Sequence, residues 1–532
     1  MKKVLIKIIP ILTLVLFNIG VAFSQPVYKQ SFKFAKFLDY LDSYYVDSVD
    51  TEEMVETAIK KILEDLDPHS TYIPPEELKK MREPLEGNFE GIGISFNILH
   101  DTLYVISPIS GGPSERVGVL AGDKIIEVDG DGIAGTGITN EDVFSLLRGK
   151  KGTKVTISVL RKSSSELIDF EITRDKIPIF SVDASYMINP NTGYIKINRF
   201  SATTVEEFQE AAATLVKNNA VNLVLDLTGN GGGYLDAAVK LADEFLPEGK
   251  IVVYTEGLNT ARREYLTTSA GSFENGNVIV LIDEGSASAS EIVSGAIQDW
   301  DRGIIIGRRS FGKGLVQREM LLPDESALRI TIAQYFTPSG RLIQKPYNNG
   351  LEEYHMEIYD RYSTGEMISK DSIHFPDSLK FSTLNKGRTV FGGGGIMPDI
   401  FVPFDTTHYS DFYRDIIRKG VLNTFVLDHV DNNRSKLQKS YPTFDMFNSQ
   451  YVIDDKVMSK FISYAKKEEL TADEKALEVS GEQIKLMLKA FIARDLYGRS
   501  EFFEVFNYSS ESYKKALEVI ESWSRYNSEI LN

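Results

Sequence analysis

One stretch of the sequence, residues 278–317, restricts the fold more than any other. Two short apolar runs, Val278–Ile282 and Gly303–Gly307, are bounded by glycine or polar residues, which is typical of buried strands. Between them, Glu291–Trp300 carries apolar residues at helical spacing. A strand, a helix and a second strand in this order indicate an α/β unit with a parallel sheet.

Side chains that could take part in a reaction follow both strands. Ser286, Ser288 and Ser290 stand in the turn before the helix, where we expect Ser290 to cap the helix and Glu291 to lie in its first turn. Lys313 stands between two glycines after the second strand. The sequence therefore predicts that hydroxyls and one amine meet at the same edge of the sheet.

A serine hydroxyl becomes a nucleophile when a neighbouring base accepts its proton. None of the six histidines lies in this stretch, so Lys313 is the candidate base, in the neutral state that burial favours. From the residue types alone, a solvated lysine and a capping serine cluster are the simpler interpretation. Residues 307–313 match the start of a phosphate-binding P-loop, but Gly314 stands where that motif needs Ser or Thr. An esterase-type G-x-S-x-G turn is excluded because Ala287 occupies its nucleophile position.

The stretch resembles the active site of the carboxyl-terminal processing peptidases, which are tail-specific Ser/Lys proteases. The resemblance lies in S-A-S-A-S-E followed by F-G-K-G-x-x-Q. In that family the middle serine is the nucleophile and the lysine follows 25 residues later, a spacing that here selects Ser288 and Lys313. The resemblance also implies that Gln317 orients the lysine amine. It covers about residues 32–399 and only the C-terminal tail lies outside it.

A glycine run forms a second candidate turn. Val221–Leu227 predicts a buried strand and Leu235–Phe245 a helix, and the glycines of residues 231–233 lie between them. Glycines let backbone N–H groups approach a ligand closely, although a plain tight turn is the alternative. The family carries N-x-G-G here, which implies an oxyanion hole formed by the N–H groups of Gly233, with Gly232 as second choice, and Ala289.

Residues 87–175 resemble a PDZ domain. Gly91, Ile92, Gly93 and Ile94 match its carboxylate-binding loop, in which successive N–H groups form a nest for an anion and the next strand pairs with a peptide. Asn140–Leu147 is the expected groove helix, with Val143 facing the peptide. In relatives a basic residue at the position of Arg148 couples peptide binding to activation; an ordinary helix-end cation is the alternative.

Composition and the N-terminus limit the compartment and the partners. A net charge of −17 argues against nucleic acid, and the absence of cysteine excludes disulfides, thiol nucleophiles and zinc–thiolate sites. A basic start, an apolar segment at residues 8–23 and small residues before Gln25 predict a secretory signal peptide. We therefore expect an exported, periplasmic protein, with an uncleaved membrane anchor as the alternative.

These observations predict a multidomain α/β chain, and the resemblance implies a crotonase-like ββα core. The expected order is a signal peptide at 1–24, an N-terminal helical region at 25–86, a PDZ domain at 87–175, a peptidase core at 176–400 with an irregular insertion at 345–395, and a C-terminal helical domain at 401–532.

The expected function is that of a secreted serine endopeptidase that cleaves proteins near or from their C-termini, after the PDZ domain recognises the substrate C-terminus. The alternative is a catalytically inactive PDZ-containing binding or scaffold protein. No metal, nucleotide or organic cofactor is implied. The expected partners are proteins or peptides with free C-termini, and a homodimer through the N-terminal helices and an unidentified adaptor protein remain open.

Overall fold

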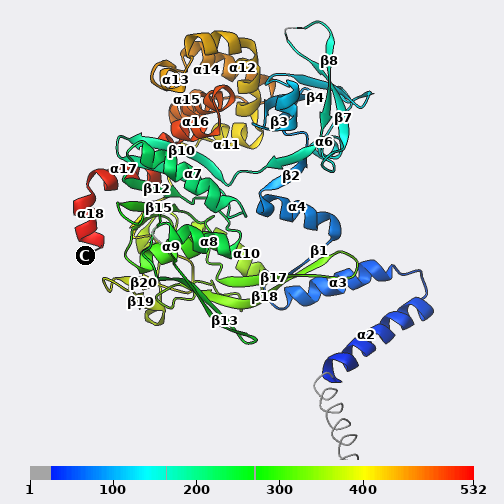
Figure 1. Ribbon diagram of the computed structural model, residues 1–532, viewed down its shortest axis with the longest axis vertical. Coiled ribbons are helices and arrows are strands. Elements are labelled where there is room, and N and C mark those ends of the chain that lie inside the picture. Colours follow the sequence, from blue (N-terminus) through cyan, green and yellow to red (C-terminus); the bar gives the residue numbers. More distant parts are fainter. Residues whose placement is uncertain (1–24, 163, 269–270, 532) are drawn as a thin grey trace, which may run out of the picture. The chain divides into compact units, whose positions relative to one another are not determined.

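The computed structural model describes residues 25–162, 164–268 and 271–531 (Figure 1). The predicted signal peptide, residues 1–24, lies outside the described residues. Within the described ranges, no helix has the length and apolar character needed to cross a membrane. Among the described residues, 25–74 and 319–330 form one compact unit and the others form a second unit.

A six-stranded sheet forms the centre of the larger unit. Its strands, in spatial order, are β10 (Val182–Asn189), β11 (Thr192–Ile197), β12 (Asn222–Asp226), β15 (Val278–Ile282), β16 (Ile304–Gly307) and β21 (Ile400–Phe401). β10 pairs antiparallel with β11, and every other neighbouring pair is parallel. All residues of β12, β15 and β16 are buried, which explains their continuous apolar sequences.

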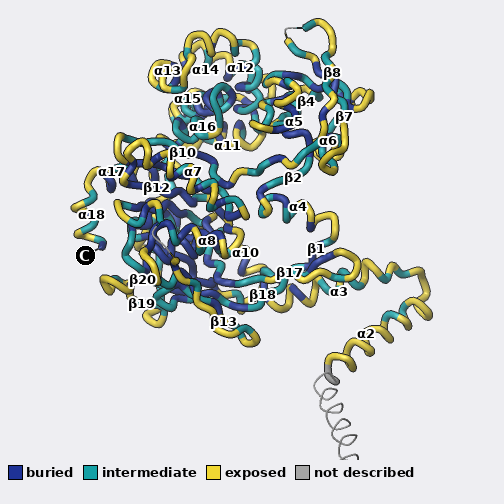
Figure 2. The backbone as a smooth tube through the Cα atoms, in the orientation of Figure 1, coloured by how far each residue is buried: buried dark blue, intermediate teal, exposed yellow. Residues whose placement is uncertain are grey.

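Successive residues of the central strands contribute to two different cores. On β15, Val278 and Val280 pack on one face with α7 (Thr204–Lys217), α8 (Leu235–Asp243) and α9 (Ala289–Asp299). Ile279 and Leu281 pack on the other face with α17 (Glu511–Glu521). Helices on both faces therefore bury the sheet, and Figure 2 shows the buried residues gathered around these strands.

The strand that follows Lys313 belongs to a second sheet. β17 (Leu315–Leu321) pairs with β18 (Ala327–Phe336), which also pairs with β13 (Ile251–Gly257), and β13 pairs with β14 (Thr260–Leu266). In the smaller unit, β1 (Thr71–Ile73) pairs antiparallel with residues 327–329. The same unit holds α2 (Gln25–Tyr44), which exposes several aromatic side chains, and α3 (Thr51–Glu64).

The region that is predicted to be a PDZ domain folds around its own core. Its sheet contains β3 (Ile94–Leu99), β4 (Thr102–Pro108), β5 (Lys124–Val128), β6 (Asp131–Gly132), β7 (Lys154–Leu160) and β8 (Leu167–Thr173), and its helices are α5 (Pro113–Val117) and α6 (Asn140–Leu147). β2 (Asn88–Gly91) pairs with β9 (Asp175–Pro178) where the chain enters and leaves this region, and α4 (Pro75–Glu86) precedes β2.

The expected irregular insertion contains more regular structure than its composition suggests. α10 (Leu351–Ser363) occupies its first part, and a short hairpin of β19 (Lys380–Ser382) and β20 (Thr389–Phe391) follows two short 3₁₀ turns at Lys370–Ser372 and Asp377–Leu379. Tyr354 and Arg361 of α10 are buried, so this helix packs closely on the core. The sequence analysis did not predict this helix.

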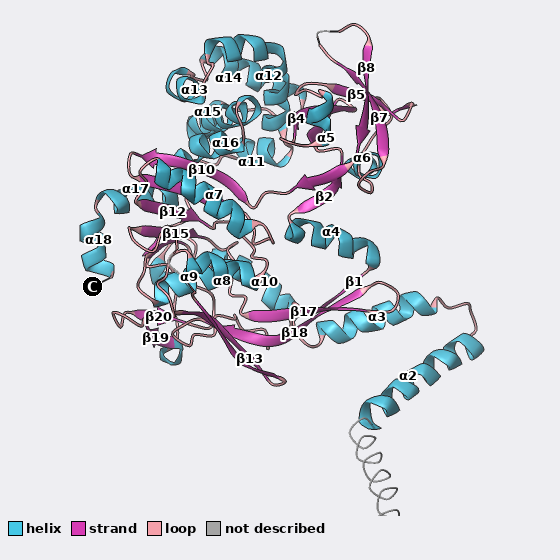
Figure 3. Ribbon diagram, in the orientation of Figure 1, coloured by secondary structure: helices cyan, strands magenta, loops and turns pink. Residues whose placement is uncertain are grey.

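The C-terminal tail is helical, as predicted, but its helices serve two purposes. α11 (Asp411–Arg418), α12 (Val421–Ser440), α13 (Phe444–Gln450), α14 (Asp455–Lys467), α15 (Glu474–Leu496) and α16 (Arg499–Phe506) share a core of their own (Figure 3). α17 instead covers the central sheet, followed by α18 (Trp523–Ile530). The last helices therefore complete the core around the central sheet.

Candidate active site

The turn between β15 and α9 holds Ser288 in an unusual conformation. Ser288 is the N-cap of α9 and has φ 55° and ψ −110°, which is rare for any residue other than glycine. Such strained backbone persists only where the surrounding structure enforces it, and it is concentrated at functional sites. Ser288 is also partly exposed, because the turn brings it to the edge of the sheet.

The two neighbouring serines have structural contacts. Ser286 is buried and its hydroxyl donates to the carbonyl of Leu227 at 2.8 Å. Ser290 is also buried and donates to the carbonyl of Asn230 at 2.8 Å. The prediction that Ser290 caps the helix is therefore wrong, since Ser288 holds that position and Ser290 ties the helix to the glycine turn.

Lys313 follows β16 in a loop that leads into β17. Its Nζ lies 3.0 Å from Oε1 of Gln317 on β17, so the amine donates a hydrogen bond to the side-chain amide. Both residues are partly buried. The structure thus brings together the lysine and the glutamine that the sequence selected.

Glu291 connects the serine turn to the lysine loop. Its side chain is completely buried, and one oxygen accepts from the N–H groups of Ser288 at 2.7 Å and Lys313 at 2.9 Å. The other oxygen accepts from the Ser310 hydroxyl at 2.6 Å and the Gly312 N–H at 2.7 Å. Burial raises the pKa of Glu291, while these four hydrogen bonds act in the opposite direction. The sequence had suggested only a first-turn acid at this position.

Tyr335 makes a second connection between the same two segments. Its hydroxyl lies 3.1 Å from the carbonyl oxygen of Ser288 and also contacts the carbonyl oxygen of Lys313. Burial raises the pKa of Tyr335 well above its usual value, and the charge of Glu291 adds to the effect, so the hydroxyl stays protonated and donates. The sequence analysis assigned no role to Tyr335.

The glycine turn after β12 lies directly against the serine. A Cβ added to Gly232 would lie 2.8 Å from the Cβ of Ser288, so only glycine fits there. The Gly232 N–H donates to Oδ1 of Asn230 at 2.9 Å, and the Gly232 carbonyl accepts from the N–H of Phe200 at 2.9 Å. Among the described residues, the N–H groups of Gly233 and Ala289 donate to no partner.

A helix of the insertion, α10, donates hydrogen bonds to the loop that precedes Lys313. Arg361 of α10 donates to the carbonyl oxygens of Arg309, Ser310 and Phe311, and its Nε pairs with Glu357 at 2.7 Å. Among the described residues, no group of three or more His, Cys, Asp or Glu side chains is arranged to hold a metal ion.

Comparisons with known proteins agree with this geometry. The model of peptidase family S41 matches residues 191–353, and a PDZ domain model matches residues 91–172. A carboxy-terminal-processing protease of Bartonella bacilliformis is 38% identical over 325 residues, which cover 60% of this chain and 74% of that protein. The chain belongs to the carboxy-terminal processing proteases of peptidase family S41. It is therefore a serine-type peptidase, as the sequence predicted, and its mixed α/β fold with a PDZ domain is also confirmed.

Other relatives cover similar parts of the peptidase. The carboxy-terminal processing protease CtpA of Bacillus subtilis is 35% identical over 59% of this chain and 66% of its own length. The solved photosystem II D1 C-terminal processing protease is 31% identical, covers 58% of this chain and 82% of that one, and has a TM-score of 0.34. A family of unknown function, DUF8443, matches residues 412–498 of the tail.

The PDZ loop that is predicted to bind a carboxylate has two N–H groups without a partner among the described residues. Within the described chain, the N–H groups of Ile92 and Gly93 donate to no partner, and Gly93 has φ 75°. The loop runs directly into Ile94 at the start of β3. This arrangement suits an anion nest beside a strand edge.

Val143 and Arg148 of the PDZ domain make contacts that the sequence did not predict. Val143 is completely buried in the PDZ core, so the prediction that it faces a peptide is wrong, and its neighbour Phe144 is an exposed aromatic residue of α6. Arg148 follows α6 and donates to Glu83 of α4 at 2.5 Å. Its guanidinium also lies over the rings of Phe89 and Phe144, so Arg148 connects the groove helix to the chain that enters the domain.

Proposed function

We propose that the peptidase uses a Ser288–Lys313 dyad, with Gln317 as the residue that positions the lysine. The observation that carries this proposal is the 3.0 Å hydrogen bond between Lys313 Nζ and Gln317 Oε1, in a loop that Glu291 ties to the strained Ser288 turn. A serine needs a base to take its proton, and the shared anchoring of both segments supports Lys313 in that role.

In the proposed reaction, Ser288 Oγ attacks the carbonyl carbon of the scissile peptide bond while the neutral Lys313 amine accepts the hydroxyl proton. The resulting ammonium then gives this proton to the nitrogen of the departing peptide, and the C–N bond breaks. Water next attacks the Ser288 ester, with Lys313 again taking and returning a proton. Both substrate fragments leave, and the serine hydroxyl is restored.

The oxyanion is proposed to bind the N–H groups of Gly233 and Ala289. In a trans peptide the C=O and N–H groups point in opposite directions. Because the Gly232 carbonyl accepts from Phe200, the Gly233 N–H of the same peptide is directed away from Phe200. The Gly232 N–H is already used by Asn230, which favours Gly233 over Gly232. One such donor contributes about 10²–10³ in rate.

Hydrolysis of an unfolded protein by the purified chain tests this function. We expect fragments to appear without added metal or nucleotide and to disappear with the Ser288→Ala variant. If the purified chain bound the protein and left it intact, the inactive scaffold would be the better explanation.

The PDZ domain is proposed to recognise the free C-terminus of the substrate. We expect a peptide with an apolar, free C-terminus to be cleaved at least about fivefold faster than its amidated twin, because amidation removes the carboxylate that the Ile92 and Gly93 N–H groups would bind. Steady-state kinetics on the two peptides measure this ratio. Equal rates would remove the PDZ domain from substrate recognition.

Arg148 offers a sharper test of the same proposal. Arg148→Ala removes the contact with Glu83 and should slow cleavage of the free peptide without altering the dyad. Arg116→Ala is the matched control, since Arg116 is an exposed PDZ arginine that pairs with Asp175. A slower Arg116→Ala variant would point to a general loss of PDZ stability.

Export is proposed from the N-terminal sequence, with cleavage before Gln25 and a periplasmic mature protein. Mass spectrometry of the protein from cells should find residue 25 at the mature N-terminus. An intact Met1 on a membrane-bound chain would favour the uncleaved anchor.

A homodimer through the N-terminal helices is also proposed. Phe32, Phe37 and Tyr40 of α2 are all more than half exposed, and exposed aromatic clusters of this kind are typical of interfaces. A monomer at all concentrations in analytical ultracentrifugation would contradict the dimer. An adaptor protein stays a prediction from the family alone.

A further inference from the structure

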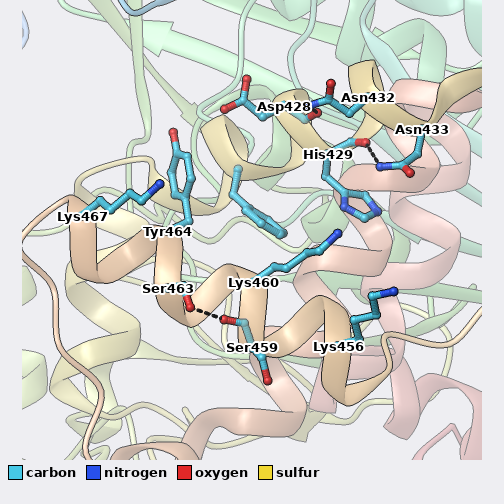
Figure 4. Close-up of a pocket in the computed structure, with 11 residues that line it drawn as sticks. Asp428, His429, Asn432, Asn433, Lys456, Ser459, Lys460, Ser463, Tyr464 and Lys467 are labelled. Atoms are coloured by element: carbon cyan, nitrogen blue, oxygen red, sulfur yellow. Dashed lines mark hydrogen bonds between the residues drawn. The ribbon is translucent and has the colours of Figure 1, made fainter.

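The helical tail contains an open groove that none of the steps above uses. The groove lies between α12 and α14 and has a volume of about 670 Å³ (Figure 4). Phe425 forms its apolar base, where its ring contacts those of His429 and Tyr464 with centroids 5.8 Å and 5.7 Å apart. The rest of the lining consists of lysines, amides and hydroxyls and a single carboxylate, Asp428.

Helical spacing explains how this lining forms. On α14, Lys456, Lys460 and Lys467 are separated by 4 and 7 residues, which places them on one face of the helix. The opposite face of α14 carries Phe461 and Ala465, which are completely buried in the core of the tail. The polar face that remains is therefore held rigidly along one side of the groove.

The lining of the groove carries more positive than negative side chains. Lys456, Lys460 and Lys467 make no hydrogen bond or ion pair with any residue that the structure describes. Burial lowers the pKa of His429, and the nearby Lys460 lowers it further, so the imidazole is neutral at pH 7 and serves as a hydrogen-bonding group. Three lysines facing one carboxylate give a local positive charge, in contrast to a chain whose net charge is −17.

We propose that this groove binds an acidic peptide segment that carries aromatic or other apolar side chains. Carboxylates of such a segment would pair with the three lysines, and its apolar side chains would contact Phe425 and Tyr464. A short peptide fits better than a long polyanion, because a polyanion would extend beyond the groove over a chain with an excess of acidic residues. The groove is thus a binding site for substrate or partner peptides that is separate from the PDZ loop and independent of the proposed dyad.

Fluorescence anisotropy with a pair of labelled, amidated peptides tests the proposal. One peptide alternates Glu and Phe, and its twin alternates Gln and Phe. The full chain is used with Ser288→Ala so that the probes are not cleaved, and amidation removes the carboxylate that the PDZ domain would bind. We expect the acidic peptide to bind at least about tenfold more tightly than its twin, and the difference to shrink as salt increases.

Charge reversal then locates the site. Lys460→Glu should weaken binding of the acidic peptide at least about tenfold. Lys466→Glu is the matched control, since Lys466 is exposed on the same helix and does not line the groove. Lys460→Gln provides a milder variant should the reversal lower the thermal stability.

Three results would overturn the proposal: equal binding of the two peptides, no binding of either, or equal weakening by Lys460→Glu and Lys466→Glu. Heparin is a further comparison. If heparin bound more tightly than the acidic peptide and Lys460→Glu abolished its binding, the groove would be a polyanion site instead.

Discussion

The Ser288→Ala variant is expected to lose about 10⁴-fold or more in kcat/KM while keeping its fold. The loss follows because the hydroxyl is proposed to form the covalent intermediate, so that what remains would come only from the proposed oxyanion donors and from binding. Lys313→Ala should cause a loss of similar size, since the two groups act as a unit and their effects do not add. Cleavage of a fluorogenic peptide measures the rate, and thermal unfolding checks the fold.

The neighbouring serines provide the controls. Ser290→Ala removes a buried hydroxyl that bonds the Asn230 carbonyl, so it should lower the free energy of unfolding by about 1 kcal/mol and leave substantial activity. Gln317→Ala should fall between these extremes, with a loss of about 10–100-fold in kcat, because the glutamine only positions the amine. An inactive Ser286→Ala together with an active Ser288→Ala would show that the wrong serine had been chosen.

Glu291→Gln should have the largest effect outside the proposed dyad, although Glu291 is not proposed to touch the substrate. The carboxylate accepts four hydrogen bonds, two at each oxygen. An amide at this position turns one oxygen into an NH₂ donor that faces two other donors in a fully buried site. We expect the free energy of unfolding to fall by about 3 kcal/mol and kcat to fall at least about 10²-fold, because the Ser288 turn and the Lys313 loop lose their shared anchor.

Chemical denaturation and steady-state kinetics measure the two effects separately. Glu284→Gln is the matched control, since Glu284 lies in the same turn and pairs with Arg308 at 2.7 Å, with both side chains partly buried. We expect this control to change kcat by less than about threefold. A Glu291→Gln variant that unfolds normally and turns over at the parent rate would mean that the anchor is dispensable for the geometry of the site.

The predicted strands and helices of the core were largely correct because they depend on local pattern. The run at residues 278–282 is continuous and apolar because both faces of β15 are buried, and α8 begins at Leu235, as predicted. The spacing of Ser288, Lys313 and Gln317 could also be recognised from the sequence, because a turn, a helix and a strand of fixed length separate these residues. A resemblance in three residue types was therefore sufficient to name the family.

Residues that act through distant partners were outside the reach of sequence reasoning. Glu291 accepts a hydrogen bond from Lys313, which lies 22 residues away in the sequence, and Tyr335 contacts Ser288, which lies 47 residues away. Helix and strand periodicity relates only residues close in the sequence, so it could not predict either contact. Val143 illustrates the opposite error: α6 was placed correctly, but only packing against the PDZ sheet decides that Val143 is buried and Phe144 is exposed.

The sequence by itself determined the family, the central strands and helices, and the candidate serine, lysine and glutamine, because these depend on residue type and short spacings. The tertiary structure decided how they are held: which serine is accessible, which carboxylate and hydroxyl join the serine turn to the lysine loop, and which N–H of the glycine turn has no partner among the described residues. It also decided that Arg361 of α10 donates hydrogen bonds to the lysine loop and that α17 covers the central sheet. These outcomes rest on burial and on hydrogen bonds between segments far apart in the chain, which only the packed fold brings together.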